Sequence, residues 1–87
     1  MTRRDIQLEM VINRACEAFQ LDSAELMGRS RCAAPSWARH VSWYILARGG
    51  WSQEEIGQMF GRDHAAVSRG VKKVEHRIAT LADDRRL

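Results

Sequence analysis

Apolar residues recur at three- and four-residue spacing along almost the whole chain, and no segment of any length alternates as a β-strand would. Proline, which interrupts helices, occurs only at Pro35. The chain has 87 residues, of which 45% are hydrophobic, so it can build one small core but not two. These features predict an all-α fold and a single domain over residues 1–87.

Capping residues and glycines divide the helical pattern into five helices. Ser52 and Glu55 form a capping box, Gly61 provides a tight turn, and Asp63 can cap the last helix. The expected helices run from Thr2 to Phe19, from a cap at Asp22 or Ser23 to Met27 before Gly28, from Pro35 to Arg48, from Ser52 to Phe60, and from Asp63 to a tail that begins at Asp83.

The same spacing predicts which residues of the last three helices face the core. They are Trp37, Val41, Tyr44 and Ile45 in the third helix, Ile56, Met59 and Phe60 in the fourth, and Val67, Val71, Val74, Ile78 and Leu81 in the fifth. Trp37 and Trp51 lie at helix entries in apolar surroundings, so we expect core packing for both. Trp43 falls off the stripe and is expected at the surface, where it would mark a contact with another protein.

The last two expected helices are joined by a short turn containing Gly61, and the second is long and basic, which is typical of a helix-turn-helix motif. Gly57 supports this interpretation. A glycine inside a helix costs about 1 kcal/mol relative to alanine, and close approach of the next helix would explain it. Any short helical pair gives a similar pattern, however, so the spacing alone leaves a generic helical pair open.

The net charge of +3 is unevenly distributed. Residues 26–53 contain Arg29, Arg31, Arg39 and Arg48 and no acidic residue. Such a stretch in a small domain indicates an anionic partner, with nucleic acid favoured over a membrane surface. The alternative is a solvated basic face without a partner.

Residues 55–67 read EIGQMFGRDHAAV and resemble the signature of the C-terminal DNA-binding domain of the bacterial replication initiator DnaA, in which E-I-G, a Phe-Gly turn and R-D-H-[ST]-T-V follow one another. Residues 38–44 resemble the family's A-R-Q-[IV]-x-x-Y helix, residues 29–31 its basic loop, and residues 71–75 the end of its recognition helix. The resemblance covers roughly residues 11–78 and implies a helix-turn-helix fold that binds double-stranded DNA in the cytoplasm, at the nucleoid.

The resemblance also implies roles for individual residues. Base contacts are expected at the start of the recognition helix from Arg62, Asp63, His64, Ala65 and Ala66, although Asp63 can equally be a plain cap and His64 a solvated side chain. The loop residues Arg29 and Arg31 are expected to supply a minor-groove arm, with one of them inserting. The expected phosphate contacts are Arg39, His40, Arg48, Ser68, Arg69 and Lys72.

Several positions depart from the family pattern. Only Gly61 precedes Arg62, where the family has two glycines, and Ala65-Ala66 replaces a Ser/Thr-Thr pair. His40 stands where the family has glutamine, and the stretch from the basic loop to the third helix is about two residues longer. We therefore expect a diverged, stand-alone relative with an altered sequence preference.

The predicted function is sequence-preferring binding to double-stranded DNA, as a small regulator of replication initiation or transcription. The alternative is a protein-interaction module that has lost specific DNA binding, and a protein partner such as a replication initiator stays open. We expect no enzyme activity, metal or cofactor, because the histidines and two cysteines lack ligand spacing and no nucleophile–base pair or phosphate-binding glycine loop occurs. No apolar run is long enough for a membrane span, and without a CxxC motif both thiols are expected to be free.

Overall fold

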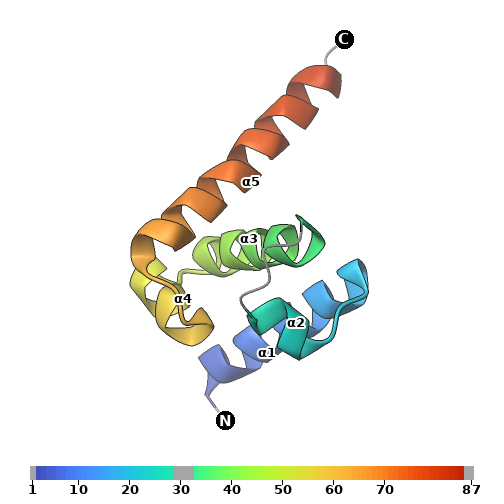
Figure 1. Cartoon of the computed structure of the whole chain (residues 1–87). Helices are drawn as coiled ribbons and strands as arrows, with labels where there is room; N and C mark the ends of the chain where they lie inside the picture. Colours follow the sequence, from blue (N-terminus) through green and yellow to red (C-terminus); the bar gives the residue numbers. More distant parts are fainter. Residues whose placement is uncertain (1, 29–32, 86–87) are drawn as a thin grey trace.

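The computed structural model describes residues 2–28 and 33–85. This part of the chain forms five helices and contains no strand: α1 (Arg3–Phe19), α2 (Ser23–Met27), α3 (Ala33–Arg48), α4 (Gln53–Phe60) and α5 (His64–Arg85) (Figure 1). The all-α prediction is confirmed.

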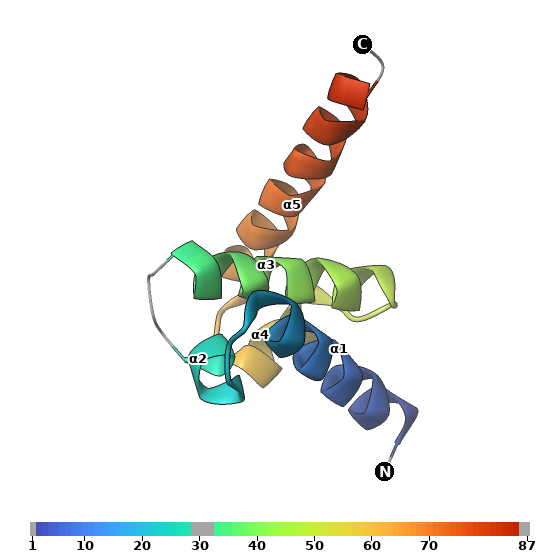
Figure 2. The same ribbon diagram turned by 90° about the vertical axis from the view of Figure 1, so that its right-hand side faces the viewer.

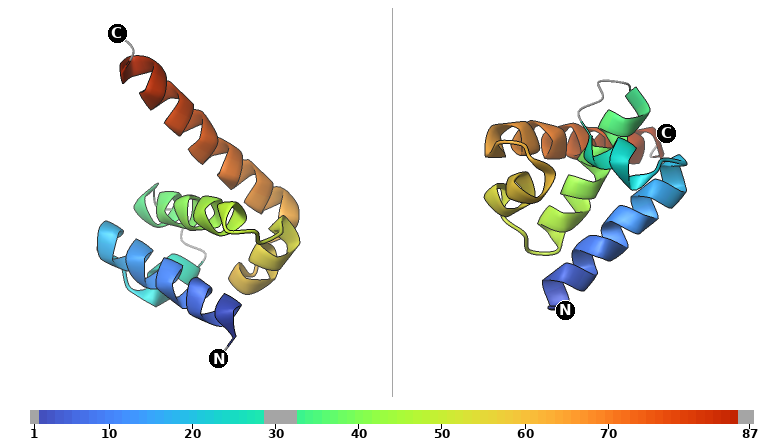
Figure 3. Two further views of the ribbon diagram at one scale, coloured as in Figure 1. Left: turned by 180° about the vertical axis from the view of Figure 1, so that it is seen from behind. Right: turned by 60° about the horizontal axis from the view of Figure 1, so that its bottom comes forward.

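Helix α3 lies at the centre of the molecule. It packs against α1 and α2 on one side and against α5 on the other, and it also contacts α4 (Figure 2). Helix α5 crosses α3 near its own N-terminal end, and its C-terminal half extends away from the other helices (Figure 3, left). None of the helices in the described part of the chain is long and apolar enough to cross a lipid bilayer.

The helix starts are set by local side chain–backbone hydrogen bonds, which include the predicted capping box of Ser52 and Glu55 and the predicted cap at Asp63. Capping boxes open three helices, pairing Thr2 with Asp5, Asp22 with Glu25, and Ser52 with Glu55. The carboxylate of Asp63 accepts the N–H of Ala66 at 2.8 Å and caps α5. Helix α3 begins at Ala33, two residues before Pro35, which therefore lies in the first turn, where a missing N–H loses no helical bond.

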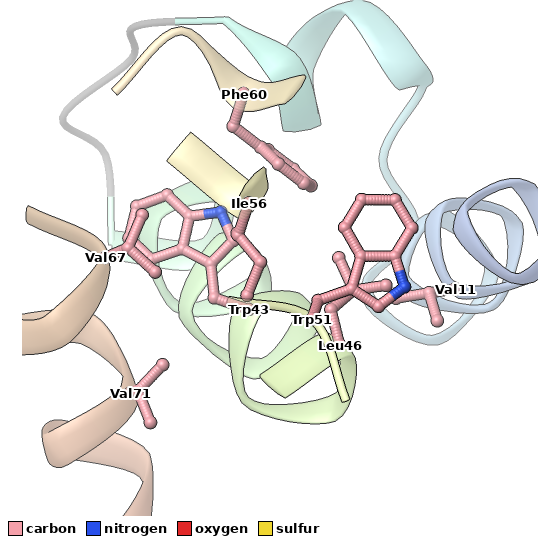
Figure 4. Packing of buried hydrophobic residues seen from close by; sticks show 8 residues of the cluster. All are labelled: Val11, Trp43, Leu46, Trp51, Ile56, Phe60, Val67 and Val71. Carbon is pink, nitrogen blue, oxygen red and sulfur yellow. The ribbon is translucent and has the colours of Figure 1, made fainter. Parts of the chain in front are cut away.

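The main core cluster joins four of the helices (Figure 4). It consists of Val11, Trp43, Leu46, Trp51, Ile56, Phe60, Val67 and Val71. The rings of Trp43 and Phe60 meet edge to face, with 5.9 Å between their centroids. A smaller cluster of Ala15, Leu26 and Ala38 attaches the short α2 to α1 and α3.

The first turn of α1 is fixed to the start of α4 by polar contacts. The indole N–H of Trp51 donates to the side-chain oxygen of Gln7 at 3.0 Å. The guanidinium of Arg4 lies 4.5 Å above the Trp51 ring and forms an ion pair with Glu55. The hydrogen bond from Arg4 lowers the pKa of Glu55 to about 2, with help from the backbone N–H of Ser52. Helix α1 therefore supports the turn that leads into α4.

The predicted buried stripe of α3 is wrong at two positions. Trp43, expected at the surface, is 3% exposed, whereas Ile45, expected in the core, is 46% exposed. Trp37 is half-buried, and Trp51 is buried as predicted. A single stripe describes a helix that packs on one side, but α3 is contacted from several sides.

The expected stripes of α4 and α5 hold only where a neighbouring helix is present. Val67, Val71 and Val74 are buried as predicted, but Ile78 and Leu81 are 45% and 48% exposed. By their numbers they belong to the C-terminal half of α5, and that half extends beyond the other helices (Figure 1). The periodicity therefore identified the apolar face of the helix, but it could not indicate whether another helix packs against that face. Met59 of α4, also expected inside, is half exposed.

Two helical glycines have steric explanations. A β-carbon at Gly57 would collide with the carbonyl oxygen of Arg62, so it is the turn backbone, and not the next helix, that requires glycine there. A β-carbon at Gly70 would lie 2.6 Å from a ring carbon of Trp43 and 2.7 Å from one of His40. Gly70 therefore allows α5 to cross α3 in direct contact with these two rings.

Candidate nucleic-acid interface

Helices α4 and α5 form a tight helix-turn-helix. Gly61 ends α4 with a φ of 66°, a left-handed conformation that glycine adopts easily, and Asp63 then caps α5. Ile56 and Phe60 of α4 pack with Val67 of α5 in the main core cluster. This packing leaves the first residues of α5 exposed to solvent.

The start of α5 presents the residues that the sequence predicts as base contacts. Asp63, His64 and Ala65 are exposed, and Ala66 is half-buried. Arg69 follows Ala65 by four residues and therefore lies on the same helical face. This outward-facing first turn and a half is the part of such a helix that enters a DNA groove.

A basic groove of about 580 Å³ lies between the start of α5 and the N-terminal half of α3. It is lined by Ser36, Arg39, His40, Trp43, Gly61, Arg62, Ala66, Arg69, Gly70 and Lys73. Every charged side chain among these described lining residues is basic. The groove therefore favours an anionic ligand.

Arg39 does not occupy the place predicted for a phosphate contact. Its side chain is 4% exposed, and its guanidinium donates to the carbonyl oxygens of Leu26 at 3.3 Å and Gly28 at 2.5 Å. It also donates to the Ser36 hydroxyl at 3.2 Å. Burial lowers the pKa of Arg39, and the neighbouring Arg62 lowers it further. The predicted phosphate contact is therefore wrong, because this buried guanidinium bonds the end of α2 instead.

The Arg62 side chain also turns toward backbone carbonyls. Its guanidinium donates to Phe60 at 3.0 Å and to Gly28 at 2.7 Å, and the residue is half-buried at the rim of the groove. In this arrangement Arg62 lies beside the exposed residues at the start of α5 while its donors point inward.

His40 is half-buried between the rings of Trp37 and Trp43, with centroids 6.3 Å and 5.3 Å away. Its Nδ1 atom is buried and has no hydrogen-bond partner among the described residues. Burial lowers the pKa of His40 most, followed by the positive charges of Lys73 and Arg39. The ring is therefore neutral at neutral pH.

This pKa shift predicts a pH dependence of stability. Because folding lowers the pKa of His40 below its ordinary value of 6.5, the stabilising effect is complete above pH 6.5 and is lost as the pH falls below it. We expect the urea midpoint of the protein to fall between pH 7.5 and 5.5 by more than that of His40→Gln. The variant retains every other titratable group, so equal pH slopes for the two proteins would contradict the assignment.

Of the remaining residues that were predicted to contact DNA, some line the groove and others lie outside it. Arg69 lines the groove, whereas the half-buried Ser68 and the exposed Lys72 lie elsewhere on α5. Arg48 is exposed at the far end of α3, beside a second hollow that also contains Glu75. The loop arginines Arg29 and Arg31 lie outside the described residues.

Lys73 is a further basic residue of α5, next to the predicted contact Lys72. It lines the groove, and its signal in the sequence is its position four residues after Arg69. The described residues contain no group of three or more His, Cys, Asp or Glu side chains placed to hold a metal ion.

The fold and the exposed start of α5 define a helix-turn-helix domain in which three further helices support the motif. The comparison with protein families identifies one family of helix-turn-helix domains. Residues 8–74 match the model described as the bacterial DnaA protein helix-turn-helix, and the chain belongs to this family. The resemblance noted in the sequence is thereby confirmed.

Similar proteins named chromosomal replication initiator protein DnaA occur in several bacteria. The one from Thermomicrobium roseum is 37% identical over 78 residues, which cover 87% of this chain and 17% of the relative. That from Cereibacter sphaeroides is 32% identical over 89 residues, covering 97% and 20%. That from Citrifermentans bemidjiense is 35% identical over 80 residues, covering 87% and 17%. The chain thus spans a fifth or less of these relatives, and no solved structure matches it.

Proposed function

We propose that the chain binds double-stranded DNA with a sequence preference and acts, as one domain over residues 1–87, in the regulation of replication initiation or transcription at the nucleoid. The observation that carries this proposal is the acid-free basic groove beside the exposed start of α5, in a helix-turn-helix of the DnaA family. The named function of the relatives as replication initiators supports it.

In this proposal the start of α5 enters the major groove. The carboxylate of Asp63 accepts from a cytosine amino group, and the exposed His64 bonds a base edge. The methyl group of Ala65 contacts thymine methyls, with the half-buried Ala66 behind it. Arg62 lies in the turn before these residues and holds that turn in place through its hydrogen bonds to the carbonyls of Phe60 and Gly28.

The DNA backbone follows the basic groove. Phosphates crossing between α3 and α5 meet a row of donors that carries no base information but fixes the position of the helix. The proposed phosphate contacts are His40, Arg69 and Lys73 in the groove, with Ser68, Lys72 and Arg48 outside it. Arg29 and Arg31, which follow Gly28 in the chain, are proposed to reach the adjacent minor groove.

The proposal that the chain is instead a protein-interaction module depended partly on an exposed Trp43. Because Trp43 is 3% exposed, it offers no such contact. The groove and the exposed residues at the start of α5 favour DNA.

The base-reading role is tested by substitutions at the start of α5. We expect His64→Ala to weaken binding to the preferred duplex by about 5- to 150-fold, the equivalent of about 1–3 kcal/mol, and binding to random duplex much less. Asp63→Ser should also reduce discrimination, since serine keeps a helix cap but removes the carboxylate. Affinities are measured by fluorescence anisotropy with both duplexes.

His76→Ala provides the matched control, because His76 is an exposed histidine on the same helix, away from its start. It should leave both affinities unchanged. Equal losses on preferred and random duplex for His64→Ala would make His64 a phosphate contact. Wild-type protein that binds neither a duplex carrying a binding site of a replication initiator nor random DNA would refute the proposed function.

A further inference from the structure

The basic groove contains one histidine, His40, among its described lining residues. Histidine is the side chain whose charge ordinarily changes near neutral pH, whereas arginine and lysine carry a fixed positive charge there. The charge of the groove therefore depends on pH through His40. The fixed charges around it are those of Arg39 on α3, Arg62 in the turn, and Arg69 and Lys73 on α5.

The imidazole ring of His40 has one buried edge and one edge toward α5. Its Nδ1 atom is buried and has no hydrogen-bond partner among the described residues. Its Cδ2 atom, which is bonded to Nε2, faces Gly70, where a β-carbon would lie only 2.7 Å away. Because glycine has no side chain, residue 70 leaves this edge of the ring uncovered. The nitrogen available to a ligand in the groove is therefore Nε2, and not the buried Nδ1.

The surroundings of His40 oppose a positive charge on its ring. Trp37 and Trp43 flank it, with ring centroids 6.3 Å and 5.3 Å away, and shield it from water. Burial lowers the pKa of His40 most, followed by the charges of Lys73 and Arg39. No acidic side chain is present among the described residues that line the groove. A protonated ring thus lacks a nearby negative charge, which a DNA backbone would bring.

We infer that His40 takes up a proton from solvent when DNA enters the groove, so that a backbone phosphate is bound by a charged imidazolium, and that the affinity for DNA therefore rises as the pH falls. The inference rests on the proposed DNA-binding function. The proton returns to solvent when the DNA dissociates.

The sign of the pH effect follows from proton linkage. A phosphate beside the ring raises the pKa of His40 in the complex above its value in the free protein. Between these two pKa values the complex binds more protons than the free protein, so lowering the pH favours the complex. One proton changes the affinity by at most about tenfold per pH unit.

The test compares the wild type with His40→Gln, because glutamine can bond a phosphate but does not titrate. Binding to one duplex is measured by fluorescence anisotropy from pH 8.0 to 6.0 at constant ionic strength. We expect the affinity of the wild type to rise about fivefold more than that of the variant over this range. His64 and His76 are present in both proteins, so their titration contributes equally to both.

Calorimetry counts the protons directly. At pH 6.5, binding enthalpies in buffers of different ionisation enthalpy should show more proton uptake for the wild type than for His40→Gln. His76→Gln is the matched control, since it removes an exposed histidine from α5 and should keep the wild-type pH dependence. Thermal melts by circular dichroism verify folding at each pH.

If His40→Gln does not fold, nuclear magnetic resonance of the wild type carries the test. The titration of the His40 ring protons should then show a higher pKa with the duplex than without it.

Equal pH dependence of the wild type and His40→Gln, with both proteins bound to the duplex, would overturn the proton uptake and leave the proposed function standing. A pKa of His40 that does not rise on addition of the duplex would do the same. Wild-type protein that binds no duplex at any of these pH values would overturn the proposed function and, with it, the proton uptake.

Discussion

Trp43→Ala is expected to lower the free energy of unfolding by about 3–5 kcal/mol, the usual effect of removing a large buried aromatic side chain. Trp43 is 3% exposed and lies in the main core cluster, against the ring of Phe60 and beside Gly70 (Figure 4). The loss is measured by urea denaturation followed by circular dichroism.

Ile45→Ala is the control on the same helix. Ile45 is 46% exposed, so its truncation should cost less than about 1 kcal/mol. Trp43→Phe should cost less than Trp43→Ala, because it keeps an aromatic ring and removes an indole N–H that is buried without a partner among the described residues. Comparable losses for Trp43→Ala and Ile45→Ala would contradict this packing of α3.

The second large effect concerns salt. If about five phosphates are neutralised, the logarithm of the binding constant falls with the logarithm of salt concentration with a slope of about −4.5, so affinity drops roughly 500-fold between 50 and 200 mM salt. The physical reason is counterion release from DNA by the basic groove and its surroundings. Anisotropy titrations at four salt concentrations give the slope.

Lys73→Gln should reduce that slope by about one unit, because Lys73 lines the groove. Arg77→Gln removes an equal charge from the outer half of α5 and should change the slope far less. An affinity that does not respond to salt would count against DNA binding altogether. Equal changes in slope for the two variants would assign the salt effect to net charge and not to the groove.

Features that depend on neighbours in the sequence were predicted well. The predicted capping box joins Ser52 to Glu55, three residues apart, and the tight turn at Gly61 needs only the local backbone. The five helices and the helix-turn-helix therefore followed from the sequence. The exposed start of α5 followed as well, since the cap at Asp63 determines where that helix begins.

Features that depend on distant contacts were not predictable from periodicity. The buried face of α3 is determined by several packed neighbours at once, and Trp43 is accommodated because Gly70, far along the chain, lacks a side chain. Arg39 looked like a surface cation because the carbonyl groups that it bonds lie at the end of α2, 11 to 14 residues away in sequence. An arginine pattern in the sequence does not distinguish a phosphate contact from a bond to a helix end.

The C-terminal half of α5 extends beyond the other helices, which implies that the two halves of the recognition helix differ in local stability. Its 22 residues correspond to a rod of about 33 Å, yet its buried valines end at Val74. Beyond that residue, helicity depends on intrinsic propensity and neighbouring hydrogen bonds, which are marginal for so short a segment in water. Amide protons of the first three turns should exchange only on global unfolding, whereas those after Val74 open locally. Warming would therefore shorten α5 from its C-terminal end while its DNA-facing start remains ordered.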